Sequence, residues 1–397
     1  MDRASAARAL TRRARTAGRA PAARGASRFT VAIAGRDDDP EIRRLLRDTV
    51  LPGQVRLTLE RDPDSFAAGR IEGDQHAFLV ARERATGRLA AIASRSSRPR
   101  FVNGSPARVG YLGGLRIAAG FGGSHELLEE GFTWCRRLHD RDPADIYLAS
   151  VVAGHPAARR RLERGGPGWP AFAPVDELVT MAIPARRGAW RGRESRRVEI
   201  VSGARVAPAQ IAGVLARHNR RYQFAPCWTA GDLATEARVP GLRPGDFLVA
   251  LRGGSVVGCA ALWDQRAFKQ VVVRGYSRSL ARWRPAINML GYLSGVPGLP
   301  PAGSALAFAH LSHFAVEDDE SGVAVDLTRA ARRAARAAGL DYVALGLSSR
   351  SPLYEAVRRA CVHRSYRSVL YAGCWPEGRA ALDGIDGRPS HPDTSVL

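Results

Sequence analysis

Lysine is almost absent from this sequence, although the chain is strongly basic. Lys269 is the only lysine among 60 basic residues, which outnumber 38 acidic residues and give a formal net charge of +22. The preference for arginine is typical of GC-rich coding sequence and does not by itself indicate selection for phosphate contacts. A surface of this charge nevertheless favours anionic partners.

Cysteines are few and scattered, and long apolar runs are missing. The five cysteines are far apart and form no CxxC pair, which argues against zinc and disulfides and favours the cytoplasm. His310 and His313, three apart on an expected strand, face opposite sides, so no metal site is expected. No apolar run approaches a membrane span, so no membrane partner is expected either. Aromatic residues make up only 7% and do not alternate with the arginines, which argues against nucleic acid.

Length and composition predict two domains. The 397 residues are enough for two cores of ordinary size. Residues 1–28 hold eight arginines and one acid; we interpret them as a basic flexible extension, either a targeting segment or the result of a start codon assigned too early. Residues 184–197 are interpreted as a basic linker. The expected domains are residues 29–183 and 198–375, and residues 376–397 are expected to be a mobile tail.

The stretch from Val109 to Leu138 carries the clearest chemistry. Its first part is apolar, with Leu115 and Ile117, and predicts a buried strand. Residues 122–124 form a glycine turn, which precedes apolar residues at helical spacing. Free backbone N–H groups and the helix dipole at such a turn favour phosphate.

The rest of the first half predicts alternating strands and helices. Helices are expected to begin at Asp39, shortly before Leu127, and at Pro156. The expected strands cover residues 29–33, 77–81, 89–93, 109–117, 146–151, 172 and 178–183. The order β-α-β-β-β-α-β-α-β predicts an α/β fold with a mixed sheet and helices on both faces.

A strand, a glycine turn and a helix in this order resemble the cofactor motif of the GCN5-related N-acetyltransferase (GNAT) superfamily. In that family the strand lies against the pantetheine arm of acetyl-CoA, and the turn holds its pyrophosphate. The resemblance implies acetyl-CoA as acyl donor. It places the cofactor on Leu115, Ile117, Gly122, Gly123, Ser124 and His125.

The motif departs from the family pattern at several positions. Gly122 stands where the family has a basic or amide residue, and His125 stands where its next glycine belongs. Further on, His155 and Leu162 replace the family's asparagine and tyrosine, so the usual general acid is missing. His155 titrates near neutrality and is a candidate acid, although a helix cap explains it more simply. The catalytic residues therefore stay unknown.

The second half repeats the order of elements and resembles a second GNAT-like unit, so each unit is expected to have its own mixed sheet with helices on both faces. Strands are expected at residues 247–251, 256–260, 306–316, 342–347 and 366–374, helices from Val325 and Pro352, and an extended loop region at 281–304. The second turn is poorer, because four acids at residues 317–320 precede Gly322 and would repel a pyrophosphate. The cofactor is therefore expected in the first unit.

These features favour an acyl-CoA-dependent N-acyltransferase that transfers an acetyl group to a primary amine held beside the thioester. The alternative is a GNAT-like protein that binds a ligand or partner without catalysis, which the degenerate motifs favour. The acceptor cannot be read from the sequence: a small amine, an aminoglycoside, a peptide terminus and a protein lysine all fit. The oligomeric state cannot be read either.

Overall fold

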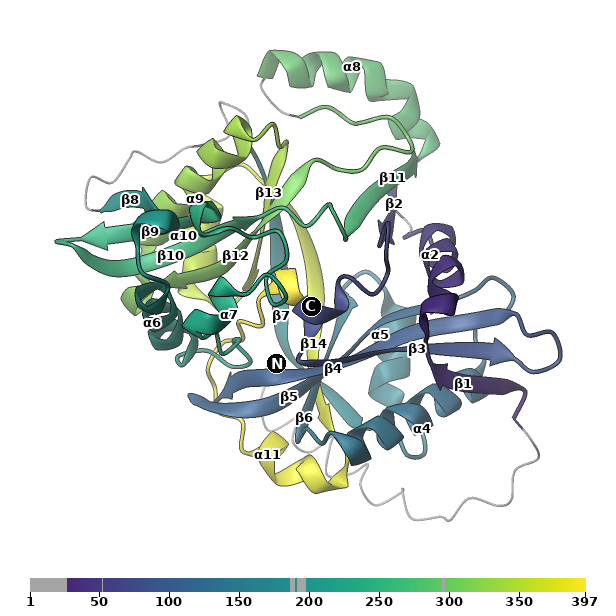
Figure 1. Ribbon diagram of the computed structural model, residues 1–397. Coiled ribbons are helices and arrows are strands. Elements are labelled where there is room, and N and C mark those ends of the chain that lie inside the picture. The colour runs from purple at the N-terminus through teal and green to yellow at the C-terminus, as the bar shows by residue number, and fades with distance from the viewer. Residues whose placement is uncertain (1–26, 52, 186–189, 191–197, 295–296) are drawn as a thin grey trace.

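One twelve-stranded sheet forms the centre of the computed structural model, which describes residues 27–51, 53–185, 190, 198–294 and 297–397 (Figure 1). From edge to edge the strands are β1 (Phe29–Ile33), β3 (Gln75–Glu83), β4 (Leu89–Val102), β5 (Ser105–Ile117), β6 (Ile146–Val152), β14 (Arg364–Cys374), β7 (Ala171–Pro184), β13 (Tyr342–Ser348), β12 (Phe308–Val316), β10 (Ser255–Trp263), β9 (Phe247–Arg252) and β8 (Glu199–Ser202). The pairs β5–β6 and β12–β13 are parallel, and the other neighbours are antiparallel. The predicted α/β class with a mixed sheet is confirmed.

Helices cover both faces of this sheet, as predicted. They are α2 (Asp39–Asp48), α3 (Gly69–Glu72), α4 (His125–Arg141), α5 (Pro156–Arg164), α6 (Pro208–Asn219), α7 (Ala230–Ala234), α9 (Ser321–Ala337), α10 (Pro352–Ala360) and α11 (Arg379–Asp383). In β9, Val249 packs into the core beneath α6 and Ala250 into the core beneath α9, because successive strand residues point to opposite faces. Ser124, Thr229 and Ser351 begin α4, α7 and α10 by accepting a hydrogen bond from a first-turn N–H group.

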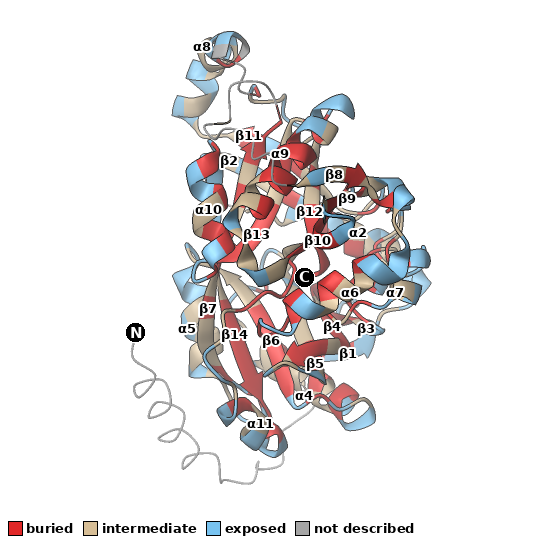
Figure 2. Ribbon diagram, turned by 90° about the vertical axis from the view of Figure 1, so that its left-hand side faces the viewer, coloured by how far each residue is buried: buried red, intermediate tan, exposed pale blue. Residues whose placement is uncertain are grey.

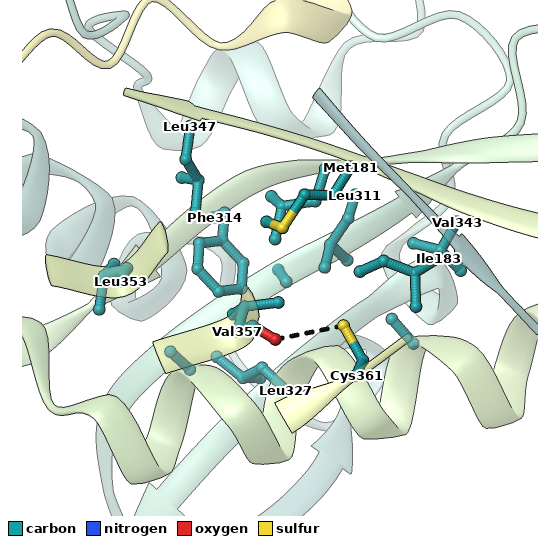
Figure 3. Packing of buried hydrophobic residues seen from close by; sticks show 14 of the residues in the cluster. Met181, Ile183, Leu311, Phe314, Leu327, Val343, Leu347, Leu353, Val357 and Cys361 are labelled. Atoms are coloured by element: carbon teal, nitrogen blue, oxygen red, sulfur yellow. Dashed lines mark hydrogen bonds between the residues drawn. The ribbon is translucent and has the colours of Figure 1, made fainter. Parts of the chain in front are cut away.

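The two halves of the chain exchange their last strands. β7 ends the first half but pairs with β13 of the second half over seven residues, from Leu178 to Pro184. β14 closes the second half but pairs with β6 and β7 of the first. Figure 3 shows the consequence: Met181 and Ile183 of β7 lie in the same core as Phe314 of β12 and Leu327 of α9. Each half therefore completes the core of the other.

This exchange corrects the expectation of two units with separate sheets. The repeated order of elements is present, and both halves contain a parallel strand pair. Apolar periodicity shows which residues of a strand face a core, but it does not show which strand lies alongside. The boundary expected at residues 184–197 falls largely outside the described residues, as does most of the basic extension at residues 1–28.

Residues 376–397 are packed into the protein, so the prediction of a mobile tail is wrong. His391, Asp393, Ser395 and Val396 are each at most 6% exposed, and Figure 2 places this end of the chain among the buried strands. The polar side chains find partners inside: Asp393 accepts hydrogen bonds from the His313 backbone N–H and from the Ser395 hydroxyl, at 3.1 and 2.6 Å. The polar composition of residues 376–397 predicted a solvated tail. Composition does not show that polar side chains have hydrogen-bond partners inside the protein.

An arm projects from the sheet where an extended loop was expected. β2 (Val55–Glu60) pairs with β11 (Gln270–Tyr276), and α8 (Arg278–Ser294) follows. The expectation of a loop over residues 281–304 was based on four prolines, but Pro285 lies inside the helix and the other three follow it. Both views show α8 at one extreme of the molecule, apart from the sheet (Figures 1 and 2).

We expect Asp393→Ala to lower the free energy of unfolding by about 2–4 kcal/mol, because the His313 N–H and the Ser395 hydroxyl lose a buried acceptor. Urea denaturation followed by circular dichroism measures the change. Asp383→Ala is the control, since Asp383 pairs with Arg379 at the surface, and we expect a change of at most about 0.5 kcal/mol. Equal effects of the two substitutions would mean that residues 390–397 contribute little to stability.

Acid should destabilise the fold before its carboxylates titrate. Burial lowers the pKa of His218, His313 and His391, that of His313 to about 4. Between pH 4 and 6.5 the unfolded chain therefore binds more protons than the folded chain, so the free energy of unfolding falls as the pH is lowered through this window.

His313→Asn should make this pH dependence shallower, by up to about 1.4 kcal/mol per pH unit. Asparagine suits the site because His313 has a φ of +50°. The slope of unfolding free energy against pH is the measurement, so a uniform loss of stability does not obscure the result. An unchanged slope would show that His313 is not kept neutral by burial.

Candidate functional site

Strands β5 and β6 form a fork in the sheet. They pair only where residues 109–111 of β5 lie beside residues 146–148 of β6. Beyond that point β5 continues to Ile117 and β6 to Val152, and no hydrogen bond joins them among the residues that the structure describes. The backbone N–H and C=O groups of β5 and β6 that face each other across this fork can pair with the amide groups of an extended ligand that lies between them like a strand.

A bulge marks the fork in β5 and recurs at the corresponding place in the second half. The register of β4 against β5 shifts between Ile92 and Ser94, where Gly114 has a φ of +64°. The register of β10 against β12 shifts between Cys259 and Ala261, beside His313 with its φ of +50°. A bulge changes the direction in which the backbone N–H and C=O groups of its strand point. In each unit, the bulge therefore reorients peptide groups of β5 or β12 at the fork.

The predicted glycine turn lies directly after β5. Gly122 and Gly123 are exposed, and a Cβ atom on either would meet no other atom within 4 Å. Ser124 caps α4 by accepting from the Leu127 N–H at 3.2 Å. Within the described chain, the backbone N–H groups of Gly122, Gly123 and His125 donate to no protein acceptor. The turn is thus an open site with free donors at the start of a 17-residue helix.

Two arginines that the sequence did not single out lie beside this turn. Phe121, which immediately precedes it, is buried, and the guanidinium groups of Arg28 and Arg88 lie 5.7 and 5.5 Å from its ring centre. Arg28 forms an ion pair with Glu83, at 2.5 Å, so Arg88 is the arginine that adds positive potential near the free N–H groups. The nearest acids are engaged: Glu126 accepts from the Arg28 backbone N–H at 2.7 Å, and Glu129 lies 3.1 Å from the His125 ring. Separations of 33 to 98 residues along the chain hid this grouping.

The six predicted cofactor residues occupy one continuous edge of the first fork. Leu115 is 47% exposed and Ile117 is half-buried at the end of β5. Residues 122–125 follow as the turn and the start of α4. Their placement is the one that the prediction requires, and their contact with a cofactor stays a prediction.

The second fork is filled by the chain itself. β12 and β13 pair only where residues 308–310 lie beside residues 342–344. Past that point, the Asp393 carboxylate accepts from the bulge N–H of His313, at 3.1 Å. Thr394 packs so closely on Gly346 that a Cβ atom there would lie 2.1 Å from its hydroxyl oxygen. Residues 390–397 thus occupy the gap that stays free of protein hydrogen bonds in the first unit.

The four acids before α9 are paired with arginines. Glu317 contacts Arg217 at 2.8 Å, and Glu320 contacts Arg252 at 2.7 Å. Asp319 pairs with Arg221. These pairs agree with a solvated, ion-paired acidic loop and offer no site for a phosphate at the second turn.

A polar cluster lies between the halves and was missed by sequence reasoning. Lys269 donates to the backbone carbonyls of Ser395 and Leu397, both at 3.4 Å. Burial lowers its pKa to about 8, while the nearby charge of Glu72 acts in the opposite direction. Lys269 is therefore a group that exchanges a proton near neutral pH.

The charge of Glu72 acts on this lysine and on a tyrosine at the first fork. Glu72 is buried in α3 and pairs with Arg61 and, at 3.1 Å, with His76. Burial, and then the charge of Glu72, raises the pKa of Tyr111, which stands where β5 leaves β6. Glu72 thus acts on groups at the fork and on Lys269. The only sequence signal was that Lys269 is the sole lysine.

The other candidates have structural roles. His155 begins α5, where its Nδ1 atom accepts from the Ala158 N–H at 3.1 Å, which agrees with the simpler helix-cap explanation. No group of His, Cys, Asp or Glu that could hold a metal ion occurs among the described residues. Of the helices in that part of the chain, none combines the length and apolar character needed to cross a bilayer.

Comparisons with known proteins identify the fold. No protein-family model and no curated protein sequence matches the chain. Among solved structures, a GCN5-related N-acetyltransferase from Sphaerobacter thermophilus is similar with a TM-score of 0.53 and 17% identity, over 91% of this chain and 99% of that one. Saccharomyces cerevisiae N-myristoyltransferase with bound myristoyl-CoA gives 0.58 and 12%, over 89% and 80%.

A third similar structure is the GCN5-related glucosamine N-acetyltransferase region of a fungal multi-domain GH3 β-N-acetylglucosaminidase. Its TM-score is 0.59 at 11% identity, over 89% of this chain and 39% of that one. These similarities show that the chain has the fold of the GNAT superfamily, in two units that share one sheet.

Proposed function

We propose that the protein is an acyl-CoA-dependent N-acyltransferase whose acyl donor binds in the first fork. The observation that carries the proposal is the contrast between the forks. The first is bordered by a free glycine turn, whereas residues 390–397 occupy the second. Similar folds occur in an N-acetyltransferase and in an N-myristoyltransferase with bound myristoyl-CoA, which supports an acyl-CoA donor. Acetyl-CoA is the donor we propose, with a primary amine as acceptor.

Each part of the first fork has a proposed task. The turn at residues 122–125 holds the pyrophosphate through its N–H groups, with Arg88 adding positive charge. The pantetheine arm lies along β5, with Leu115 and Ile117 beside it. The bulge at Gly114 directs a backbone N–H toward the thioester carbonyl and polarises it. The rate gain then comes mainly from holding amine and thioester together.

Lys269 is the proposed proton acceptor for the amine. Its lowered pKa leaves part of it neutral near pH 8, and the charge of Glu72 acts both on Lys269 and on Tyr111 at the fork. A base must be deprotonated to act, so the rate should rise with pH through this pKa.

The five free cysteines agree with a reducing compartment, and we propose the cytoplasm.

The direct test is calorimetric titration with acetyl-CoA, followed by an assay of released coenzyme A thiol over a panel of primary amines. We expect saturable binding to one site and thiol release that depends on the amine. Binding without thiol release for any amine would favour the non-catalytic alternative. No binding at millimolar acetyl-CoA would end the enzyme proposal.

Gly123→Asp should weaken acetyl-CoA binding at least about tenfold, because it adds bulk and negative charge where the pyrophosphate approaches the backbone. Its φ of +81° adds strain to any side chain there. Gly322→Asp is the matched control in the first turn of α9, where aspartate suits the helix dipole, and it should bind normally. The reverse pattern would assign the cofactor to the second unit.

Lys269→Met should lower kcat/KM by about a hundredfold and remove the rise in rate near pH 8, since a positioned base contributes about 10²–10⁴. His155→Asn is the control: asparagine also caps a helix, so its pH profile should match that of the unchanged protein. If His155→Asn loses the pH-dependent rise and Lys269→Met keeps it, the base is His155 and the proposed role of Lys269 is wrong.

A further inference from the structure

The arm formed by β2, β11 and α8 exposes several large apolar side chains among the residues that the structure describes. Four large apolar residues of α8 are at least 62% exposed, and Leu293 reaches 75%. These residues are Trp283, Met289, Leu290 and Leu293. Single exposed apolar residues are ordinary at protein surfaces, but several on one helix mark an interaction site.

The apolar residues point away from the rest of the arm. Arg284 and Asn288 lie on the inner side of α8, where both donate to the Leu299 carbonyl, at 2.9 and 3.1 Å. Leu293 lies on the opposite side, because 100° per residue places it roughly 180° from Arg284. Since α8 lies at one extreme of the molecule (Figures 1 and 2), a flat surface can reach this side without meeting the sheet.

The charge of α8 is of one sign. Its residues 278–294 contain three arginines and no acidic residue. Arg278 and Arg282 are exposed on α8, and Trp283 lies next to Arg282. Arginine beside tryptophan and leucine on one helix is the composition of helices that lie in the interface of an anionic bilayer. A second copy of this chain would bring the same three arginines on α8, with no acid on that helix to pair them.

We propose that α8 is an interfacial helix that binds the protein to an anionic lipid surface. Trp283, Met289 and Leu293 enter the boundary between headgroups and acyl chains, and Arg278 and Arg282 contact lipid phosphates. The helix lies on the membrane and does not cross it, so the lack of a spanning segment does not bear on this role. The proposal is independent of the acyl-transfer chemistry, and it departs from the expectation of no membrane partner.

The test is co-sedimentation of the full chain with vesicles of equimolar phosphatidylcholine and phosphatidylglycerol. We expect binding to these vesicles that weakens with added salt, and at least about tenfold weaker binding to phosphatidylcholine alone. No binding to the anionic vesicles, or equal binding to both compositions, would overturn the proposal.

Two double variants separate the apolar and charged contributions. Trp283→Gln with Leu293→Gln, and Arg278→Glu with Arg282→Glu, should each weaken binding at least about tenfold. Thermal unfolding should be unchanged, because these side chains are exposed. Val362→Gln and Arg336→Glu are controls at exposed positions outside the arm and should bind normally.

Sedimentation velocity without lipid tests the alternative that a second copy of this chain binds to α8. We expect the oligomeric state of the full chain to be the same before and after the Trp283→Gln and Leu293→Gln substitutions. A dimer that these substitutions dissociate, together with no vesicle binding, would show that α8 pairs with a second copy and would overturn the membrane proposal.

Discussion

The exchange of the two last strands is the constraint on which the rest of the structure depends. β14 lies between β6 and β7, and β7 in turn pairs with β13, so backbone hydrogen bonds run from one unit into the other without a break. Met181 and Ile183 carry the first half into the core of the second. Because each half supplies a strand that the other needs, the two forks are held in a fixed relation across one sheet.

The same exchange explains why the chain can follow β14 into the centre of the molecule. Residues 390–397 reach the second fork, where Asp393 meets the bulge of β12. On the way, the Pro392 carbonyl accepts a hydrogen bond from Arg100 of β4, at 2.7 Å. A carboxylate of the chain thus occupies one fork, and the other keeps its glycine turn free. Two copies of one architecture therefore differ at their forks.

Many arginines in the described part of the chain have local structural contacts. Many arginines pair with nearby acids, such as Arg217 with Glu317 and Arg252 with Glu320. Arg98 and Arg100 are fully buried and donate to backbone carbonyls, and burial lowers their pKa to about 9 and 10. The arm differs because its exposed arginines on α8 stand beside exposed apolar residues. Position, and not the net charge of +22, therefore distinguishes a binding surface from structural arginines.

The sequence by itself determined many of the elements and the predicted cofactor turn. β1 has the predicted limits, α5 begins at Pro156 as predicted, and Gly122 and Gly123 form the expected turn before α4, because apolar period, caps and glycine act over a few residues. The tertiary structure decided what depends on distant partners. Strand exchange, the burial of Asp393 beside His313, the approach of Arg28 to Phe121 and the lowered pKa of Lys269 each join residues far apart in the chain. Local patterns specify which residues need burial or a partner, and only the folded chain specifies which partner each one meets.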